Sequence, residues 1–426
     1  MKTKAVRLYG ANDIRLEEFE LPAIGADEML IKIVSDSACM SSYKAVNQGT
    51  AHKRVPKDIA INPTIIGHEL CGEIIEVGAS VDKKYSPGQK FTLQPAMKGT
   101  HEAAGYSFQY LGGNATYAIV PKCYIDQGCV LLYDGEGYFP GSLAEPLSCV
   151  IGTVHANYHT RQGEYIHDMG IVKGGKMALL AGCGPMGLAL IDYITHCDRK
   201  PGLLVVTDID QNKLDFAAAA LSVEKAKENG VQLIYLNSSS PDATDKMMEI
   251  SHGTGYNDIF VFAPVASLIE QADAMLAYDG CLNFFAGPSD REFTAKLNFY
   301  NVHYNATHIV GTSGGNTDDM MEALEMAATG KLNPALLLTH IGGIDSTIDT
   351  VKLLPQLSGA KKLIYNHISM PLTAIADFAK KGKTDPLFAS LAEICQRYGG
   401  FWSVEAENYL LENAPKHVMY KAKEAL

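Results

Sequence analysis

The glycine-rich turn Gly182-Cys183-Gly184-Pro185-Met186-Gly187 is the sequence feature that most constrains the fold of this chain. The apolar run Met177–Ala181 before it predicts a buried strand, and Pro185–Cys197 predicts the helix that follows. The first glycine permits a tight turn, the second permits close approach to the backbone, and the third permits the helix to pack against the strand. A strand, a glycine turn and a helix in this order predict a doubly wound parallel sheet.

An acidic residue follows the turn at the spacing expected of a dinucleotide-binding unit. Asp208 ends the apolar run Leu203–Thr207, about 20 residues after Gly187. Its carboxylate would accept both ribose hydroxyls and repel a 2′-phosphate, which favours NAD over NADP. The residues that we expect to bind the dinucleotide are Gly182, Gly184, Pro185, Met186, Gly187, Asp208 and Lys213. The alternative is an ordinary glycine-rich connection, which would not require this combination of features.

The chain before about residue 155 differs in pattern from the chain after Met177. The first part contains short strands separated by Gly, Pro, Asn and Asp, which indicates a β-rich domain. Its expected strands are Glu28–Val34, Cys71–Val77, Lys90–Gln94 and Ala115–Val120. The later part alternates apolar strands with helices, as expected of a sheet that helices cover on both faces. Its further expected strands are Leu203–Thr207, Gln232–Leu236, Asp258–Phe262, Leu282–Phe285 and His308–Gly311.

The C-terminal part of the chain is predicted to become mostly helical. A helix is expected at Thr317–Thr329 and a strand at Leu336–His340. Two more helices are expected at Leu387–Arg397 and Glu405–Leu411, with Ser403 as the cap of the second.

Composition excludes several classes of function. A chain of 426 residues predicts two domains, and its formal net charge of −12 argues against a nucleic-acid groove or a site for an anionic membrane. No signal peptide and no run of eighteen apolar residues is recognisable, so we expect a cytoplasmic protein. The nine cysteines include no Cys-x-x-Cys pair, which is unlike a disulfide framework.

Four side chains ahead of the glycine turn form a mixed set of candidate zinc ligands. Cys39 follows a predicted strand, His68 and Glu69 come about 30 residues later, and Glu145 precedes Pro146. A thiolate, an imidazole and a carboxylate together suit zinc, whereas each residue alone is more typical of a packed side chain. Glu69 and Glu145 stay equivalent here, because either carboxylate can bind the metal directly or act through water.

Taken in order, these segments resemble the zinc-dependent medium-chain dehydrogenases. The matching segments are Cys39-Met40-Ser41, Gly67-His68-Glu69 through Gly78, Pro87-Gly88-Gln89-Lys90, Glu145-Pro146 and the Gly182 turn. The resemblance covers residues 1 to about 365 and implies an α/β protein in which a Rossmann domain interrupts a β-rich, chaperonin-10-like catalytic domain. The implied domains are residues 1–157 (catalytic), 158–312 (Rossmann) and 313–426 (return to the catalytic domain with a helical extension).

The resemblance also narrows the chemistry. Glu145 stands where classical alcohol dehydrogenases have a cysteine ligand, which is similar to the polyol branch of the family. The stretch from Gly330 to Tyr365 and the helical tail are similar to L-sorbose-1-phosphate reductases, which interconvert a ketohexose 1-phosphate and a hexitol phosphate. By resemblance, zinc acts as a Lewis acid, and the catalytic residues are Ser41, which passes the hydroxyl proton, Glu69 and Lys44.

Several positions depart from the family pattern. Residues 96–117 lack the four cysteines that bind a structural zinc in some members, so one zinc is expected. Ser42 stands where an aspartate usually orients the histidine ligand, so either another acceptor is expected to hold His68 or the metal is expected to bind less firmly. Lys44, Lys98 and His101 are candidates to neutralise a substrate phosphate.

Two other functions stay open on the sequence alone. The first is a dehydrogenase of an unphosphorylated polyol or of another secondary alcohol, such as threonine. The second is a family member that binds a dinucleotide without catalysis, for which Ser42 is the hint. Family resemblance also predicts a homodimer or homotetramer that acts on a small sugar or polyol.

Overall fold

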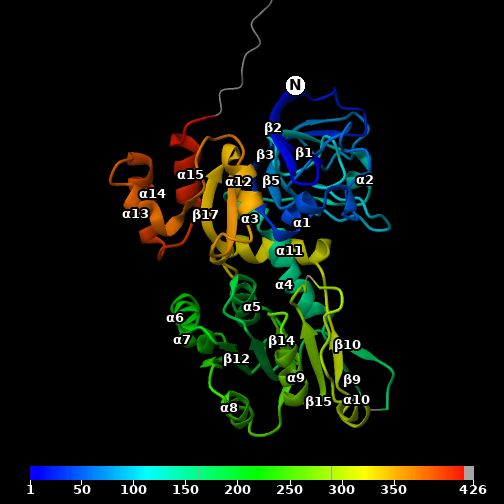
Figure 1. The fold of residues 1–426 in the computed structure, drawn as a ribbon, viewed down its shortest axis with the longest axis vertical. Coiled ribbons are helices and arrows are strands. Elements are labelled where there is room, and N and C mark those ends of the chain that lie inside the picture. The colour runs from blue at the N-terminus through cyan, green and yellow to red at the C-terminus, as the bar shows by residue number, and fades with distance from the viewer. Residues whose placement is uncertain (162, 289, 417–426) are drawn as a thin grey trace, which may run out of the picture. The chain divides into compact units, whose positions relative to one another are not determined.

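The structure, a computed structural model, describes residues 1–161, 163–288 and 290–416 (Figure 1). The chain forms two compact units: a first unit of Met1–Glu145 together with the chain from Leu337 onward, and a second unit of Pro146–Leu336. The second unit extends beyond the expected range 158–312 at both ends, and residues 417–426 of the expected third segment lie outside the described residues. The boundaries drawn from the sequence stay a proposal.

The first unit is built on an eight-stranded mixed sheet. Its strands are β3 (Met29–Ala38), β5 (Leu70–Val77), β6 (Lys90–Leu93), β7 (Tyr117–Val120), β8 (Val130–Leu132), β17 (Leu338–Gly343), β18 (Lys361–Tyr365) and β19 (Thr373–Ala374). The order is β19-β17-β18-β3-β5-β6-β8, and β7 also pairs with β3. Nine of the ten residues of β3 are buried, because β5, β7 and β18 all pair with it. The C-terminal segment therefore completes the sheet that the N-terminal segment begins.

A second, smaller sheet of the first unit contains strands that the sequence analysis did not predict. These strands are β1 (Lys2–Gly10), β2 (Asp13–Glu20) and β4 (Thr64–Ile65), in the antiparallel order β2-β1-β4. Charged residues such as Lys4 and Arg7 interrupt the apolar pattern of β1, although Val6 and Leu8 are fully buried. The helices of this unit are α1 (Met40–Gln48), η1 (Gly49–Ala51), α2 (Lys122–Asp126), α3 (Phe139–Ser142), η3 (Ile344–Ser346), α12 (Thr347–Leu353), η4 (Ile375–Asp377), α13 (Phe378–Lys381), α14 (Pro386–Arg397) and α15 (Val404–Asn413).

The two C-terminal helices lie where the sequence predicts them, and α15 is tied to the sheet through one carboxylate. Ser403 caps α15, because its side chain accepts from the backbone N–H of Ala406 at 3.1 Å. Glu407, which is fully buried, accepts from the backbone N–H groups of Tyr138 (2.5 Å) and Phe139 (2.9 Å). It also accepts from the hydroxyl of Tyr365 on β18 at 2.6 Å. Glu407 therefore joins the C-terminal helix to β18 and to the start of α3.

The second unit has the predicted doubly wound parallel sheet. Its strands are β11 (Lys176–Leu180), β12 (Leu203–Asp208), β13 (Gln232–Asn237), β14 (Tyr256–Val261), β15 (Leu276–Phe284) and β16 (His308–Val310). They are all parallel, in the order β13-β12-β11-β14-β15-β16, so the chain crosses over after its third strand. The short strands β9 (Tyr158–Thr160) and β10 (His167–Met169) form a separate pair.

Helices of this second unit connect the parallel strands. They are α5 (Pro185–His196), α6 (Gln211–Ala220), α7 (Val223–Glu228), α8 (Ala243–Ile250), α9 (Ala266–Met275), α10 (Phe299–Tyr304) and α11 (Thr317–Ala328), and α4 (Ala144–Ala156) leads into the unit. The predicted strand Leu336–His340 begins two residues late, because Asn333 accepts from Ala335 N and starts the 3-10 turn η2 (Pro334–Leu337). Within the described ranges, every helix is too short or too polar to cross a lipid bilayer.

Candidate active site

The glycine turn of the second unit leaves space in front of the first turn of α5. The turn begins after β11, and Gly182 N donates to Thr207 O on β12 at 2.8 Å. A Cβ on Gly187 would lie 2.0 Å from the carbonyl oxygen of Gly182, so only glycine allows α5 to pack this closely. A Cβ on Gly184 would meet no atom within 4 Å. Within the described part of the chain no side chain caps α5, so the N–H groups of its first turn and the open space in front of them fit a pyrophosphate.

Asp208 and Lys213 lie close to this turn. Asp208 is the last residue of β12 and is 6% exposed, and its carboxylate accepts from the backbone N–H of Asp210 at 3.1 Å. Burial raises the pKa of the Cys183 thiol to about 12, an effect that the charge of Asp208 increases and that of Lys213 decreases. Both charged groups are therefore near the turn, although the binding roles that we expect for them stay predictions.

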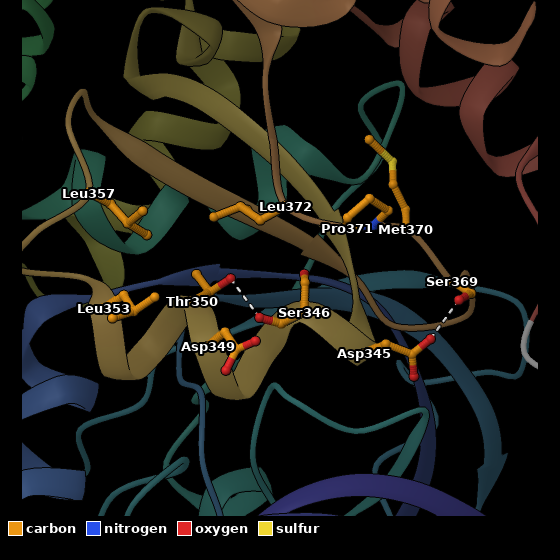
Figure 2. A pocket seen from close by; sticks show the side chains of 10 residues that line it. All are labelled: Asp345, Ser346, Asp349, Thr350, Leu353, Leu357, Ser369, Met370, Pro371 and Leu372. Carbon is orange, nitrogen blue, oxygen red and sulfur yellow. Dashed lines mark hydrogen bonds between the residues drawn. The ribbon is translucent and has the colours of Figure 1, made fainter. Parts of the chain in front are cut away.

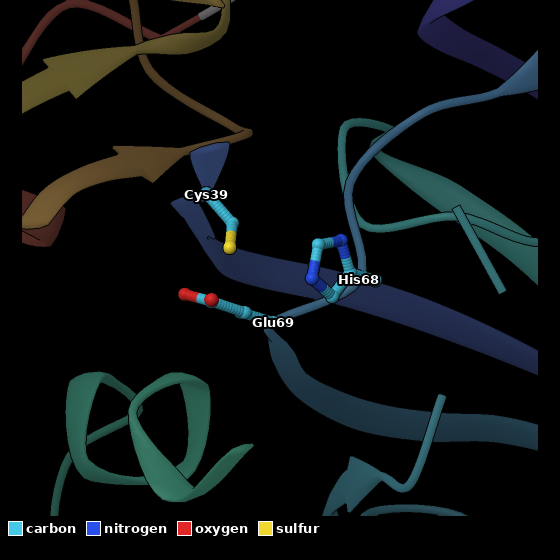
Figure 3. Close-up of side chains that lie close together, drawn as sticks. All are labelled: Cys39, His68 and Glu69. Carbon is cyan, nitrogen blue, oxygen red and sulfur yellow. The ribbon is translucent and has the colours of Figure 1, made fainter. Parts of the chain in front are cut away.

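The first unit brings Cys39, His68 and Glu69 together (Figure 3). Their Sγ, imidazole nitrogen and carboxylate oxygen all lie within 4.8 Å of one another. The sheet explains this meeting, because β3 and β5 are antiparallel neighbours and Asp36 on β3 is paired with Leu70 on β5. Cys39, just after the end of β3, and His68 and Glu69, just before the start of β5, therefore lie at the same edge of the sheet.

Glu69 is held in its charged form and keeps one oxygen without a partner. The side chain is 1% exposed and forms an ion pair with Lys361, the first residue of β18. Burial disfavours the carboxylate, but the charges of Lys361 and His68 lower its pKa below the usual value. Among the described residues no group forms a hydrogen bond of normal geometry with the buried Glu69 Oε2, although the Ser37 hydroxyl is near enough to the carboxylate to help lower its pKa. A buried anionic oxygen beside a thiol and an imidazole fits a divalent cation such as zinc.

Two serines and a tyrosine surround the imidazole of His68. Ser42 Oγ lies 3.2 Å from Nδ1, whereas Ser41 Oγ (3.3 Å) and Tyr106 OH (3.5 Å) lie near Nε2. The Ser42 hydroxyl itself thus reaches the ring of His68 from the position where the family usually has an aspartate. With Nδ1 held by Ser42, Nε2 is the nitrogen on the side of the Cys39 thiol, since Ser41 Oγ lies near both.

Glu145 is close enough to respond to this group, although it is not one of the three. Burial, together with the negative charge of Glu69, raises the pKa of Glu145 to about 7. The structure thus places Glu69 in the immediate cluster and Glu145 beside it, while the direct ligand stays a proposal. Ser41 Oγ also donates to Cys39 Sγ at 3.0 Å. Lys44 on α1 forms no hydrogen bond or ion pair with a residue of the described chain, so the structure does not join it to the cluster.

Three residues of the site escaped the sequence analysis: Lys361, Tyr106 and Asp36. Asp36 accepts from the backbone N–H of Glu69 at 3.0 Å and from Asn114 Nδ2 at 2.8 Å. Burial raises its pKa to about 7, against the opposing charge of His68. The only signal for Lys361 was a charged pair, Lys361-Lys362, at the start of an apolar strand.

A separate pocket of about 500 Å³ lies between α12 and residues 369–372 (Figure 2). Asp345 and Asp349 line it, and Ser369 Oγ donates to Asp345 Oδ2 at 2.6 Å. None of its lining residues belongs to the group around His68. Its acidic lining is unsuited to an anionic ligand.

Comparison with known proteins identifies the family. Residues 25–127 match the alcohol dehydrogenase GroES-like domain, and residues 185–329 match the zinc-binding dehydrogenase family. Mannitol-1-phosphate 5-dehydrogenase of Aliivibrio fischeri is 50% identical over 96% of this chain and 98% of its own length. L-sorbose 1-phosphate reductase of Klebsiella pneumoniae is 46% identical over 97% of this chain and 98% of its own. The uncharacterized protein YggP of Escherichia coli is 52% identical over 96% of this chain and 97% of its own.

Solved structures show the same fold. The 2R,3R-butanediol dehydrogenase of Bacillus subtilis superposes with a TM-score of 0.67 over 85% of this chain and 99% of its own, at 21% identity. A Sinorhizobium meliloti protein bound to NADP superposes with a TM-score of 0.68 over 86% of this chain and 100% of its own, at 18% identity. The family matches and the full-length relatives show that this chain belongs to the zinc-type medium-chain dehydrogenases and is an oxidoreductase of the zinc alcohol dehydrogenase family.

Proposed function

We propose that the protein is a zinc- and NAD-dependent reductase that interconverts a ketohexose 1-phosphate, L-sorbose 1-phosphate, and a hexitol phosphate. The observation that carries this proposal is the buried group of Cys39, His68 and Glu69. It occurs in a chain that is 46% identical over nearly its whole length to L-sorbose 1-phosphate reductase. We also propose that the protein is a homodimer or homotetramer.

In this proposal, zinc is held by Cys39 Sγ, His68 Nε2 and the unpartnered Oε2 of Glu69, with Glu145 beside them. A bound zinc supplies a Lewis acid that polarises the oxygen of a ketone or an alcohol. Lys361 stabilises the charge of Glu69 through their ion pair, and Ser42 fixes the ring of His68. These two residues orient the ligands without providing a ligand atom themselves.

Proton transfer falls to Ser41. Its hydroxyl lies 3.0 Å from Cys39 Sγ and 3.3 Å from His68 Nε2, next to the place where the substrate oxygen would be bound. From there it can give a proton to the oxygen of a ketone during reduction, or accept one from an alcohol during oxidation. Lys44, on the same helix, stays the candidate for the outer end of this relay.

The dinucleotide is proposed to bind at the glycine turn. Gly182, Gly184 and Gly187 with Pro185 and Met186 would surround the pyrophosphate, since the space in front of Gly184 is open. The carboxylate of Asp208 at the end of β12 favours NAD, because it would repel a 2′-phosphate. Lys213 would add a contact to the ribose or to a phosphate.

A second candidate activity is supported by the mannitol-1-phosphate 5-dehydrogenase relative, at 50% identity. The name of this relative states that carbon 5 is oxidised while the phosphate is on carbon 1, so the reacting carbon is remote from the phosphate. In a 2-ketose 1-phosphate the reacting carbon is next to the carbon that carries the phosphate. Both candidates require recognition of a phosphate. The unphosphorylated polyol and the inactive dinucleotide-binding protein are the alternatives that the following experiment separates from them.

The test combines a substrate panel with metal analysis. NADH oxidation is measured with L-sorbose 1-phosphate, fructose 6-phosphate, L-sorbose and a simple ketone, and the zinc content is measured on the same preparation. We expect turnover of a phosphorylated ketose and about one zinc per chain. Cys39→Ser should lose zinc and turnover but keep NADH binding, whereas Cys123→Ser, a half-buried cysteine on α2, should keep all three. Turnover of the unphosphorylated ketones alone, or full activity of Cys39→Ser, would contradict the proposal.

A further inference from the structure

Four basic side chains gather on one stretch of the first unit. Lys44 lies on α1, and His52, Lys53 and Arg54 follow η1. Burial is the main cause that lowers the pKa of His52, and the positive charges of Arg54, Lys53 and Lys44 lower it further. All three charges therefore lie near the His52 ring. Within the described ranges, none of the four forms an ion pair with a carboxylate. In a chain with a net charge of −12, this is a local excess of positive charge without a partner.

Tyr106 connects these cations to the metal-ligand candidates. The Arg54 guanidinium carbon lies 5.7 Å from the centroid of the Tyr106 ring, and the His52 ring stacks on Tyr106 at 5.5 Å with an interplanar angle of 9°. The hydroxyl of the same tyrosine lies 3.5 Å from His68 Nε2. Because Tyr106 is 5% exposed, its ring forms a fixed wall rather than a mobile surface group. Tyr106 thus contacts the basic residues with its ring and the imidazole of His68, our proposed zinc ligand, with its hydroxyl, so the two groups are only one side chain apart.

The donors of the basic residues suit a phosphate group. The backbone N–H of Arg54 donates to His52 Nδ1 at 3.3 Å, so Nε2 of the neutral ring carries the hydrogen and is a donor. The half-buried Arg54 guanidinium offers several N–H groups in a planar arrangement that matches phosphate oxygens. In contrast, Lys98 and His101, which we considered from the sequence, are exposed, and nothing in the structure joins them to this group.

We propose that His52 and Arg54 form the subsite that binds the phosphate of the substrate, with Lys53 and Lys44 adding charge around it. The subsite deepens the proposed function on which it rests, because it explains how a phosphorylated ketose or hexitol is distinguished from its unphosphorylated counterpart. The guanidinium binds the phosphate oxygens by charged hydrogen bonds, and the imidazole adds a neutral donor.

The experiment compares Arg54→Gln with wild-type protein and with Lys383→Gln, which removes the same charge from an exposed lysine in the loop after α13. Two quantities are measured: the ratio of kcat/KM for L-sorbose 1-phosphate to that for L-sorbose, and the Kd of inorganic phosphate by calorimetry on the NADH complex. We expect Arg54→Gln to lower the ratio about tenfold to a hundredfold and to weaken phosphate binding by a similar factor, as loss of a charged hydrogen bond predicts. Lys383→Gln should leave both quantities unchanged.

The two measurements distinguish failure of the subsite from failure of the proposed function. If wild-type protein prefers the phosphorylated ketose and Arg54→Gln keeps the same ratio and the same phosphate Kd, the subsite is refuted while the function stands. If no phosphorylated substrate is turned over, the proposed function fails. The anion site is then supported by phosphate binding that Arg54→Gln abolishes, and refuted by phosphate binding that is absent or unaffected. A His52→Phe variant provides a second check, since it keeps a ring that can stack on Tyr106 but removes the N–H donor without changing the guanidinium.

Discussion

Replacing the buried Glu407 by glutamine should make the free energy of unfolding depend less on pH. The side chain is fully buried, and burial raises its pKa to about 7 from the usual value of 4.5. Between these two values the folded chain keeps a proton that the unfolded chain releases. The protonated Glu407 therefore contributes its full stabilisation below the pKa that it has in the unfolded chain. This stabilisation is lost as the pH rises through the pKa that it has in the folded chain.

The size of the effect follows from the distance between the two pKa values. One proton taken up on folding changes the free energy of unfolding by about 1.4 kcal/mol per pH unit. With pKa values of 4.5 and about 7, wild-type protein should lose about 3 kcal/mol of stability from this residue across the interval. The Glu407→Gln variant cannot titrate at this position. The difference in stability between wild-type protein and the variant should therefore fall by about 3 kcal/mol as the pH rises.

The protein contains its own reporter for this measurement. Trp402 is the single tryptophan of the chain, is 2% exposed, and donates through Nε1 to Tyr365 OH at 2.9 Å. The same hydroxyl donates to Glu407. Urea unfolding followed by tryptophan fluorescence at several pH values therefore reads the region around Glu407 directly.

A control variant separates this effect from a general change of charge. Glu412→Gln removes a carboxylate from an exposed position of the same helix, α15, and should keep the wild-type pH dependence. If the free energy of unfolding changes with pH equally in wild-type protein and in Glu407→Gln, the reasoning is refuted. Loss of this pH dependence in Glu412→Gln would refute it as well.

Four further predictions concern the glycine turn, cofactor choice and the buried ion pair. Gly187→Ala should destabilise the protein by more than about 3 kcal/mol in urea unfolding. Gly184→Ala should keep the wild-type melting temperature but weaken NADH binding more than about tenfold in a fluorescence titration, because its Cβ enters the space for the pyrophosphate; unchanged NADH binding would contradict this. Asp208→Ser should lower the preference for NADH over NADPH about tenfold in kcat/KM, and an unaltered preference would show that the carboxylate does not select the cofactor. Lys361→Met should destabilise the zinc-free protein by about 3–5 kcal/mol, because Glu69 loses its counter-ion, and added zinc should reverse part of this loss in thermal unfolding; equal loss with and without zinc would argue against metal binding at Glu69.

Much of the second unit could be predicted from the sequence because its pattern is local. Strands β11 and β12 are continuous apolar runs, since helices cover them, and the glycine turn lies directly between β11 and α5. The doubly wound sheet was confirmed for this reason. In contrast, β1 was missed because charged residues on one of its faces alternate with buried ones, which weakens the apolar signal.

The composition of the cluster around His68 was partly predictable, but its geometry was not. Cys39, His68 and Glu69 were selected by their chemistry and by family resemblance, and only the register of β3 with β5 shows why they meet. The contact between Lys361 and Glu69 joins residues 292 apart, so no local pattern could reveal it. Tyr106 lies in the loop between β6 and β7, whose path periodicity does not describe, and Ser42 reaches the ring from helix α1.

The pairing of β18 with β3 has a consequence for the newly synthesised chain. When β3, β5 and β6 leave the ribosome, the partner of β3 on one side is still hundreds of residues from being made, because β18 begins only at Lys361. Until then the part of β3 that β18 covers, Ser35–Ala38, presents an unpaired edge, a form of exposure that promotes aggregation. The cluster around Glu69 also lacks its lysine during this period. Maturation of the first unit must therefore wait for nearly the whole polypeptide, whereas the second unit, made from one uninterrupted segment, can fold earlier.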